Sequence, residues 1–359
     1  MKIAVLTDSL VNRGGGEREI MTLLDYFDVD LYTGIYNSET TFSKFKQYQI
    51  VNFLKKKLPP FINTMYLRWK FKRIHFKRKY DAYVYFWPAP LAGAFRTSPN
   101  IWYCNTPLRY LYDCREEFLK SFNPLLRPLV KFAMFFIQRS DKKSIKNADI
   151  ILANSINVRE RVKKYYNLSS RVVYPPVNIG AFKFKEFGDF CLSPGRLEKS
   201  KGVHLAIKAF QKMPDKKLVV LGGGVEEGEI KAMCEGYSNI QFVGAVEEKK
   251  LQDYYANCCC TIYLSRNEDF GMIPIESMSA GKPCIAVNEG GFKETIIHKK
   301  NGYLVEPQDL NFEGISKGIE WTWKNAKKMK TDCRKRAKLF SEEKYVSEIR
   351  EAIEEAIKK

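Results

Sequence analysis

Two carboxylates stand eight positions apart, Glu268 and Glu276, in the stretch EDFGMIPIESMSAGKPCIA at residues 268–286. Pro274 suits the first turn of a helix, because its missing N–H has no partner there, and Gly281 is typical of a helix end. We expect Glu268 before a loop that follows an apolar strand, and Glu276 within the first helical turn, where the helix dipole favours a negative charge. Carboxylates at both ends of such a loop face the crevice where open α/β sheets bind ligands. The pattern also fits one solvated and one dipole-stabilised glutamate.

Two cations follow another expected strand of the same half. Arg196 and Lys201 flank a short loop in SPGRLEKSKG, residues 193–202. A guanidinium binds a phosphate through two hydrogen bonds, and an ammonium acts as a point charge, so the pair suits a diphosphate. The alternative is a surface loop with ordinary charges.

Two loops of the first half add further candidates. NRGGGE, residues 12–17, lies between a strand and a helix, so the backbone N–H groups of Gly15 and Gly16 can approach an anion at the helix N-terminus. This loop matches neither the dinucleotide fingerprint nor a P-loop. The other candidate is YCNTPLRYLYD, residues 103–113, which follows a strand.

A metal site is not expected. The Asp-x-Asp pair Asp28 and Asp30 stands where a turn and the start of a strand are predicted. The spacing of cysteines and histidines does not match a zinc site. The sequence therefore predicts no metal and no other cofactor.

The elements that would position these residues alternate along the chain. Strand-like segments, rich in β-branched and aromatic residues, lie at 2–7, 29–34, 81–87, 100–104, 149–154, 189–195, 217–222, 240–244, 258–265 and 283–287. Helical segments, such as 16–27, 202–212 and 247–256, come between them. Strands separated by helices imply parallel sheets with right-handed crossovers. We predict an α/β protein with two Rossmann-like domains facing a central cleft, joined near residues 174–178.

Composition fits a globular protein of two domains. The chain has 359 residues, 45% of them hydrophobic, and no run approaches the roughly 20 apolar residues of a membrane span. The first residues do not resemble a signal peptide. The nine cysteines are most simply small core residues in a reducing compartment, so a cytoplasmic location is expected.

The net charge of +19 is concentrated in one segment. Residues 44–79 contain twelve Lys or Arg and no Asp or Glu. Within it Ile62, Met65, Tyr66 and Trp69 have the spacing of one apolar helical face. Three interpretations stay open: contact with an anionic membrane surface, a solvated helix face, or nucleic-acid binding. For the first, the expected contact residues are Lys55, Lys56, Lys57, Trp69, Lys70, Lys72 and Arg73.

Taken together, these motifs resemble one family. GGGE, ANSINVRERVKKYY, VVYPPVN, GRLEKSKG, the two-glutamate stretch and GYLVEP follow one another as in the retaining nucleotide-sugar glycosyltransferases of family 4, which have the GT-B fold. The most specific element is the pair of glutamates with its internal FG. YCNTPLRYLYD and VVYPPVN are most similar to the mannosyltransferase branch.

The resemblance implies a role for each candidate in the second half. Glu276 would bind the ribose hydroxyls of the nucleotide, and Glu268 the transferred sugar. Arg196 and Lys201 would stabilise the leaving diphosphate, in place of a metal ion. No covalent nucleophile stands out, which fits front-face substitution with retention. The loop between the glutamates would contact the donor through Asp269, Phe270, Gly271, Met272 and Ile273.

The resemblance also implies domains and substrates. Residues 1–177, together with a C-terminal helix at 341–359 that crosses back, would form the acceptor domain, and residues 178–340 the nucleotide-sugar donor domain. GDP-mannose is the favoured donor, with UDP- and ADP-sugars as alternatives. The acceptor would be a glycan, carried on a lipid at the inner face of the membrane, and no nucleic acid would be bound.

The chain departs from the family at Asn105, where a histidine usually stands close to the transferred sugar. An amide can donate a hydrogen bond but carries no positive charge. Either this lineage manages without the histidine, or the residue was substituted. Asn105 and Arg109 remain the candidates for the acceptor side.

Other functions compete with this one. An epimerase or a phosphorylase with the GT-B fold is one alternative. A dehydrogenase lacks the dinucleotide fingerprint, and a basic nucleic-acid-binding protein would leave Glu268 and Glu276 without a purpose.

Overall fold

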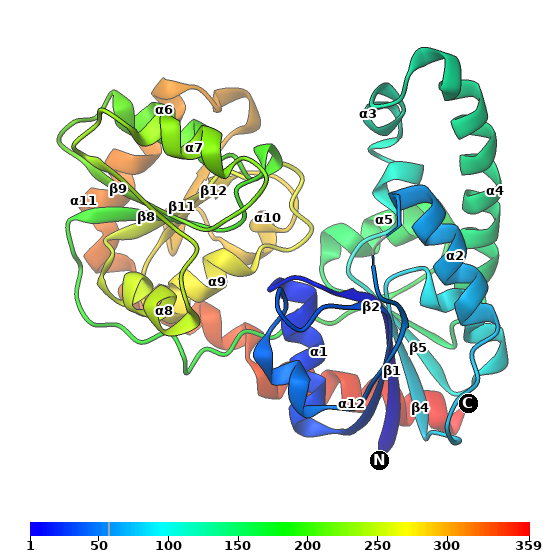
Figure 1. The fold of residues 1–359 in the computed structure, drawn as a ribbon. Helices are drawn as coiled ribbons and strands as arrows, with labels where there is room; N and C mark the ends of the chain where they lie inside the picture. Colours follow the sequence, from blue (N-terminus) through cyan, green and yellow to red (C-terminus); the bar gives the residue numbers. More distant parts are fainter. Residues whose placement is uncertain (57) are drawn as a thin grey trace. The chain divides into compact units, whose positions relative to one another are not determined.

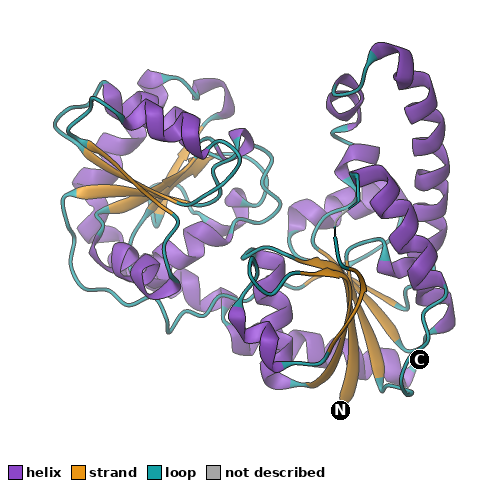
Figure 2. Cartoon of the chain, viewed as in Figure 1, coloured by secondary structure: helices purple, strands orange, loops and turns teal. Residues whose placement is uncertain are grey.

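The fold is that of a computed structural model, which describes residues 1–56 and 58–359. Lys57, one of the expected membrane contacts, lies outside the described residues. The chain divides into two compact units, one of residues 1–176 and 345–359 and one of residues 177–344 (Figures 1 and 2).

The first unit is built on a parallel sheet with the strand order β3-β2-β1-β4-β5-β6-β7. Its strands are β1 Lys2–Leu10, β2 Asp28–Tyr36, β3 Ile50–Leu54, β4 Ala82–Phe86, β5 Asn100–Cys104, β6 Ile150–Ala153 and β7 Arg171–Val172. Its helices are α1 Gly15–Tyr26, α2 Pro60–Lys72, α3 Arg115–Lys120, α4 Arg127–Ile145, α5 Ile156–Tyr166 and α12 Glu342–Lys358. The parallel arrangement is the predicted one, although β3 and β7 were not among the expected strands.

Helices cover this sheet on both faces. Ile3 and Val5 of β1 lie in a core with α1 and α12, whereas Ala4 and Leu6 lie in a core with α2 and α5. Figure 1 shows α1 and α12 together beside β1. Since both faces are covered, β4 and β5 are buried along their whole length and show no polar alternation.

The C-terminal helix α12 completes the first unit. Tyr345, Ile349 and Ile353 pack in the core that contains β1. The Tyr345 ring also meets the Tyr103 ring edge-on, with centroids 5.6 Å apart. The predicted return of the chain to the N-terminal half is confirmed.

The second unit has its own parallel sheet, with the order β10-β9-β8-β11-β12-β13. The strands are β8 Phe190–Pro194, β9 Lys217–Leu221, β10 Ile240–Gly244, β11 Cys260–Tyr263, β12 Cys284–Val287 and β13 Gly302–Val305. The helices are α6 Val203–Gln211, α7 Glu227–Cys234, α8 Glu248–Asn257, α9 Met272–Ser279, α10 Phe292–Thr295 and α11 Phe312–Ala337. One face packs against α6, α7 and α11, and the other carries a smaller core around Phe292.

The basic segment folds as a 3₁₀ turn at Ser43–Gln47, β3 and α2. A helix was predicted correctly here, and of the four residues expected on its apolar face only Tyr66 packs against the core. Ile62, Met65 and Trp69 are exposed, whereas Leu67 and Phe71 are buried. The apolar face of α2 that the sequence indicates is therefore a solvent-facing one.

All nine cysteines are free, and all but Cys114 are buried. They behave as the small core residues that the sequence predicted.

In each sheet the order of the strands reverses at one place. This switch point lies between β1 and β4 in the first sheet and between β8 and β11 in the second. Open parallel sheets bind ligands outside the carboxyl ends of their strands at this point. The loops after these strands are therefore where a site is to be sought.

Candidate functional site

The loops after β8 and β11 meet at the switch point of the second sheet. The loop after β8 carries Arg196 and Lys201, and the loop after β11 carries Glu268. Lys201 Nζ lies 3.0 Å from Glu268 Oε2, and both side chains are less than one fifth exposed. Ser265 Oγ donates a second hydrogen bond to the same carboxylate oxygen, at 2.7 Å. Two predicted site residues that are 67 positions apart thus form one ion pair.

Arg196 takes a more open position in the same loop. Its side chain is 57% exposed, and its Nη1 donates to Glu198 Oε1 at 2.7 Å. Each of the two expected diphosphate ligands therefore has a carboxylate partner in its own unit. An incoming diphosphate would have to compete with Glu198 and Glu268 for these cations.

Glu276 lies deeper than its position in the sequence suggested. Helix α9 begins at Met272, so Glu276 is its fifth residue and not part of the first turn, where we expected it. The reason is Gly271, whose left-handed backbone (φ 86°) ends the loop directly before Met272. The Glu276 carboxylate is buried and accepts a hydrogen bond from the hydroxyl of buried Tyr255, at 2.7 Å. Tyr255, on α8, was not predicted as a site residue.

The loop between the two glutamates is held by the turn that follows β12. The N–H of Gly291 donates to the carbonyl of Glu268 at 3.0 Å. A Cβ atom at Gly290 would lie 2.3 Å from that carbonyl oxygen, so the turn approaches the loop too closely for another side chain. Glu289 accepts from Arg266 and from the N–H of Asn267. The stretch NEGG at 288–291 could have indicated this close contact, but the contact was not predicted from the sequence.

A second glycine loop, residues 222–224, packs on the loop that carries Arg196. Gly222 has φ 134°, and a Cβ atom there would lie 1.8 Å from the carbonyl oxygen of Gly195. Leu197 N–H donates to the carbonyl of Gly223 at 3.0 Å. These contacts fix the backbone around Arg196, and they also were not predicted.

In the first unit, the glycine loop precedes α1 as predicted. Gly15 and Gly16 are the first two residues of the helix. The Glu17 carboxylate folds back and accepts from the N–H of Asn12 at 3.2 Å. A Cβ atom at Gly16 would lie 3.5 Å from both Asn105 and Trp87, so the start of α1 is close to the loops after β4 and β5.

Asn105 belongs to a buried polar cluster. Its Nδ2 donates to Glu19 Oε2 at 2.6 Å, and its Oδ1 accepts from Asn154 at 3.5 Å. Glu19 is 3% exposed. Burial raises the pKa of this carboxyl from 4.5 to about 8, with the Asn105 hydrogen bond opposing the rise. Glu19 was not predicted as a site residue, because in the sequence it is one of several charged residues on a helix of mixed polarity.

Arg109 is half-buried at the start of a 3₁₀ turn, Arg109–Leu111. Its Nε donates to Asp113 Oδ2 at 2.9 Å. Arg161 of α5 also lies 4.0 Å from Asp113 and donates to Thr106 Oγ1. The loop after β5 is thus a charged surface next to Asn105.

The Asp-x-Asp pair is part of a surface ion-pair network at the amino end of β2. Asp28 lies 3.1 Å from Lys2 Nζ, and Asp30 accepts from the Tyr80 hydroxyl and lies 3.4 Å from Arg78. Among residues 1–56 and 58–359, no group of three or more His, Cys, Asp or Glu could hold a metal ion.

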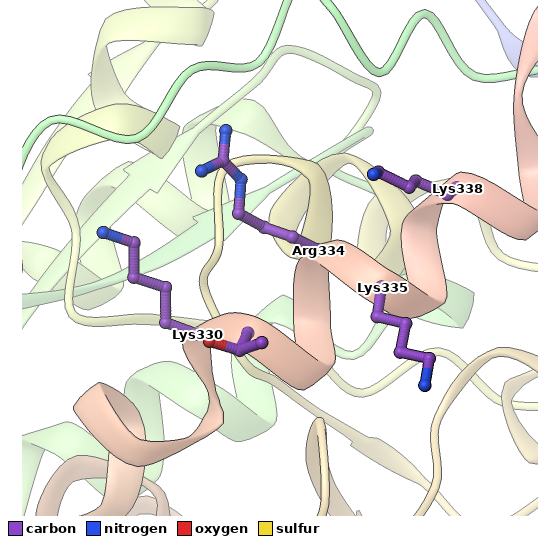
Figure 3. A pocket seen from close by; sticks show the side chains of 5 residues that line it. Lys330, Arg334, Lys335 and Lys338 are labelled. Carbon is purple, nitrogen blue, oxygen red and sulfur yellow. The ribbon is translucent and has the colours of Figure 1, made fainter.

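A cavity of 510 Å³ in the second unit lies along α11 (Figure 3). It is lined by Lys330, Thr331, Arg334, Lys335 and Lys338. None of the residues expected to bind the donor lines this cavity, so it does not belong to the candidate site.

Comparison with known proteins gives a family match within the second unit. Residues 178–340 match the family model described as glycosyl transferases group 1. The alpha-1,3/1,6-mannosyltransferase ALG2 of Dictyostelium discoideum is 29% identical over 279 residues, which is 67% of this chain and 66% of that protein. Human ALG2 is 28% identical over 63% of this chain and 60% of its own length. The match thus spans less than two thirds of each of these relatives.

Solved structures resemble the whole chain. Sucrose-phosphate synthase of Thermosynechococcus elongatus has a TM-score of 0.77 at 17% identity, covering 99% of this chain and 98% of that one. HepE of Anabaena, in complex with UDP-glucose, has a TM-score of 0.72 at 18% identity, covering 99% and 100%. The chain therefore has the GT-B fold, and its residues 178–340 match the family model of the group 1 glycosyl transferases.

Proposed function

We propose that the protein is a retaining, metal-independent glycosyltransferase that moves a mannosyl residue from GDP-mannose to a lipid-linked glycan at the inner face of the membrane. The observation that carries the proposal is the Lys201–Glu268 ion pair at the switch point of the group 1 domain. The ALG2 relatives support a mannosyl donor and a glycan acceptor. HepE, solved with UDP-glucose, supports a nucleotide-sugar and makes UDP-sugars the main rival donors.

The cations of the loop after β8 serve the leaving group. Negative charge accumulates on the diphosphate as the glycosidic bond breaks, so Arg196 and Lys201 stabilise the transition state more than the bound donor. Lys201 is already positioned by Glu268 and lies 5.9 Å from the centroid of the Tyr263 ring. Fixed cations do the work that a divalent ion does in other transferases.

The two glutamates bind the ends of the donor. Glu276 is buried and oriented by Tyr255, and its carboxylate accepts from the ribose hydroxyls. Once the diphosphate takes over Lys201, Glu268 is available to a hydroxyl of the transferred sugar. Asp269, Phe270, Gly271, Met272 and Ile273 line the path between them, and Asn105 and Arg109 serve the acceptor.

The basic face of α2 brings the enzyme to its lipid-linked acceptor. Lys72 and Arg73 are exposed, and the Arg73 guanidinium lies 4.8 Å from the centroid of the Trp69 ring. Lys70 Nζ lies 5.3 Å from the same ring. Lys55 and Lys56, both exposed, extend the basic surface. Each cation near an anionic leaflet contributes about 1 kcal/mol. Over residues 1–56 and 58–359, no helix has the length and apolar character needed to cross a bilayer.

The test is donor binding measured by calorimetry with GDP-mannose, UDP-glucose and an ADP-sugar. Arg196→Ala and Lys201→Ala should each weaken binding of the cognate donor by about ten- to a hundred-fold, since each removes a charged hydrogen bond. The matched control is Lys217→Ala, which breaks an ion pair with Asp189 at the amino end of the same sheet. Binding to none of the donors, or an equal loss in the control, would overturn the site.

Transfer is tested separately with labelled GDP-mannose and a mannosylated, lipid-linked acceptor. Product that keeps the anomeric configuration of the donor is the expected result. Transfer from a UDP-sugar but not from GDP-mannose would overturn the donor, and an inverted product would overturn retention.

A further inference from the structure

The first half of α4 and the turn before it expose an unusual number of large apolar side chains. Their exposed fractions range from 52% to 88%. We refer to them as the apolar ridge, and its members are Leu125, Leu126, Leu129, Phe132, Phe135 and Phe136. Single exposed apolar residues are ordinary, but a contiguous group of this size marks an interaction surface.

The ridge is a face of the helix and not a frayed end. Leu125, Leu129, Phe132 and Phe136 are spaced by four, three and four residues, so they fall on one side. The Phe132 and Phe136 rings contact each other edge-on, with centroids 4.8 Å apart. Residues on the opposite side of the helix, such as Met134 and Ile137, are buried. Helix α4 is therefore apolar on two sides, and only one of them is used by the fold.

The segment that carries the ridge is strongly basic along its own length, whereas the neighbouring α3 exposes Glu116 and Glu117. Between residues 118 and 146 there are seven Lys or Arg and one acidic residue, Asp141, which is fully buried. Lys131, Arg139, Lys142 and Lys143 are exposed on the same helix. A protein partner with an acidic surface would pair with the charges but leave the apolar rings unexplained. An anionic bilayer satisfies both, because phosphate groups bind the cations while the rings enter the acyl region.

Helix α4, which carries the ridge, contacts the basic helix α2, for which membrane contact is proposed above. Arg68 of α2 donates to Ser140 at 2.9 Å and to Ser144 at 2.8 Å, and lies 3.7 Å from Asp141. These contacts are buried or partly buried, and they join α2 to α4. In Figure 1, the start of α4 and α3 extend beyond the sheet of the first unit.

We propose that the apolar ridge inserts into an anionic lipid bilayer and anchors the first unit on it. The ridge supplies the part of the binding that does not depend on salt, whereas the basic residues of α2 supply the part that does. This inference rests on the proposed function only in that the acceptor is carried on a lipid. It adds a second and different membrane element to the basic helix that the sequence indicated.

The experiment is sedimentation of the full chain with vesicles of phosphatidylcholine and phosphatidylglycerol that contain no donor or acceptor. The test variant combines Leu129→Ser, Phe132→Ser and Phe136→Ser, and partition should fall by about a hundred-fold, including at 0.5 M salt. The matched control combines Tyr237→Ser and Ile357→Ser, which change exposed apolar residues outside the ridge, and it should bind like the wild type. A charge variant, Lys72→Glu with Arg73→Glu, should lose binding at low salt but keep the residual binding at high salt.

Three results would overturn the proposal. One is unchanged vesicle binding of the ridge variant, and another is an equal loss in the control. The third is a wild type that does not bind vesicles and is a dimer in ultracentrifugation, while the ridge variant is a monomer. The ridge would then contact a second copy of the chain. Folding of each variant is checked by its melting temperature.

Donor binding in solution separates this inference from the proposed function. A ridge variant that binds GDP-mannose normally and transfers mannose to a soluble acceptor, but does not bind vesicles, supports both. Vesicle binding through the ridge in a protein that binds no nucleotide-sugar supports the ridge and overturns the function.

Discussion

The first unit should lose stability between pH 5.5 and pH 8.5, and replacing Glu19 by Gln should abolish much of that loss. Glu19 is 3% exposed, and its carboxyl lies 2.6 Å from the amide nitrogen of Asn105. Burial raises its pKa from 4.5 to about 8. Glutamine keeps the shape and a hydrogen-bonding oxygen but cannot ionise.

The sign follows from which state binds the proton. Below pH 4.5 the carboxyl is protonated in both states, and Glu19 adds no pH dependence. Between pH 4.5 and about 8 the unfolded chain loses the proton while the folded chain keeps it, so stability falls as pH rises. Each pH unit in that window costs about 1.4 kcal/mol, and from pH 5.5 to 8.5 the contribution of Glu19 comes to about 3 kcal/mol.

Thermal unfolding of the wild type and Glu19→Gln at the two pH values measures this contribution. For a unit of this size, about 3 kcal/mol corresponds to roughly 6–12 °C. The melting temperature of the wild type should therefore drop that much more than that of the variant. Asp8, whose pKa burial raises to about 7, is present in both proteins and cancels in the comparison. Glu160→Gln, at an exposed position on α5, is the control and should follow the wild type. Parallel pH curves for wild type and Glu19→Gln would refute the reasoning.

Three further outcomes are expected. Asn105→His should raise kcat by about ten-fold with an unchanged KM for the donor, because an imidazole can carry the positive charge that the amide lacks. A slower variant in steady-state kinetics would contradict this and show that the enzyme requires Asn105 for its own donor sugar. Glu276→Ala should weaken donor binding by about ten- to a hundred-fold in calorimetry, and unchanged affinity would remove Glu276 from the site. Transfer should persist in excess EDTA, since Arg196 and Lys201 supply the positive charge. Activity that is lost to the chelator and restored by magnesium would contradict this and make Asp28 and Asp30 candidate metal ligands again.

Most strands were predictable where the sheet is covered on both faces, although the buried strand β13, Gly302–Val305, was not among those expected. Residues 100–104 and 240–244 were expected as strands at the bounds that β5 and β10 have. A central strand of a parallel sheet is a short apolar run, and such runs are visible in the sequence. Strand β3, Ile50–Leu54, was missed because it lies at the edge of its sheet, is only partly buried and is surrounded by lysines. Strand β7 has two residues, too few for any periodic signal.

The site was predictable in its residue types but not in its pairings. Arg196, Lys201, Glu268 and Glu276 were all expected at strand ends. That Lys201 binds Glu268 depends on β8 and β11 being neighbours in the sheet, which no local pattern specifies. Glu276 lies in the second turn of α9 because the helix begins directly after Gly271, which has a left-handed backbone. Pro274 alone suggested a later start of the helix, which would have put Glu276 in the first turn.

Glu19 shows why Asn105 has to be considered together with its surroundings. In the sequence, Asn105 is a single departure from a family pattern, an amide in place of an imidazole. In the structure, that amide donates to Glu19 and accepts from Asn154, so a buried carboxyl is part of the same arrangement. An amide beside Glu19 leaves the carboxyl protonated near neutral pH, because its hydrogen bond offsets only part of the cost of burying a negative charge. An imidazolium at the same place would compensate it and lower the pKa of Glu19. Burial and the residue at position 105 therefore set the pKa of Glu19 together, and positions 19 and 105 have to be considered as a pair.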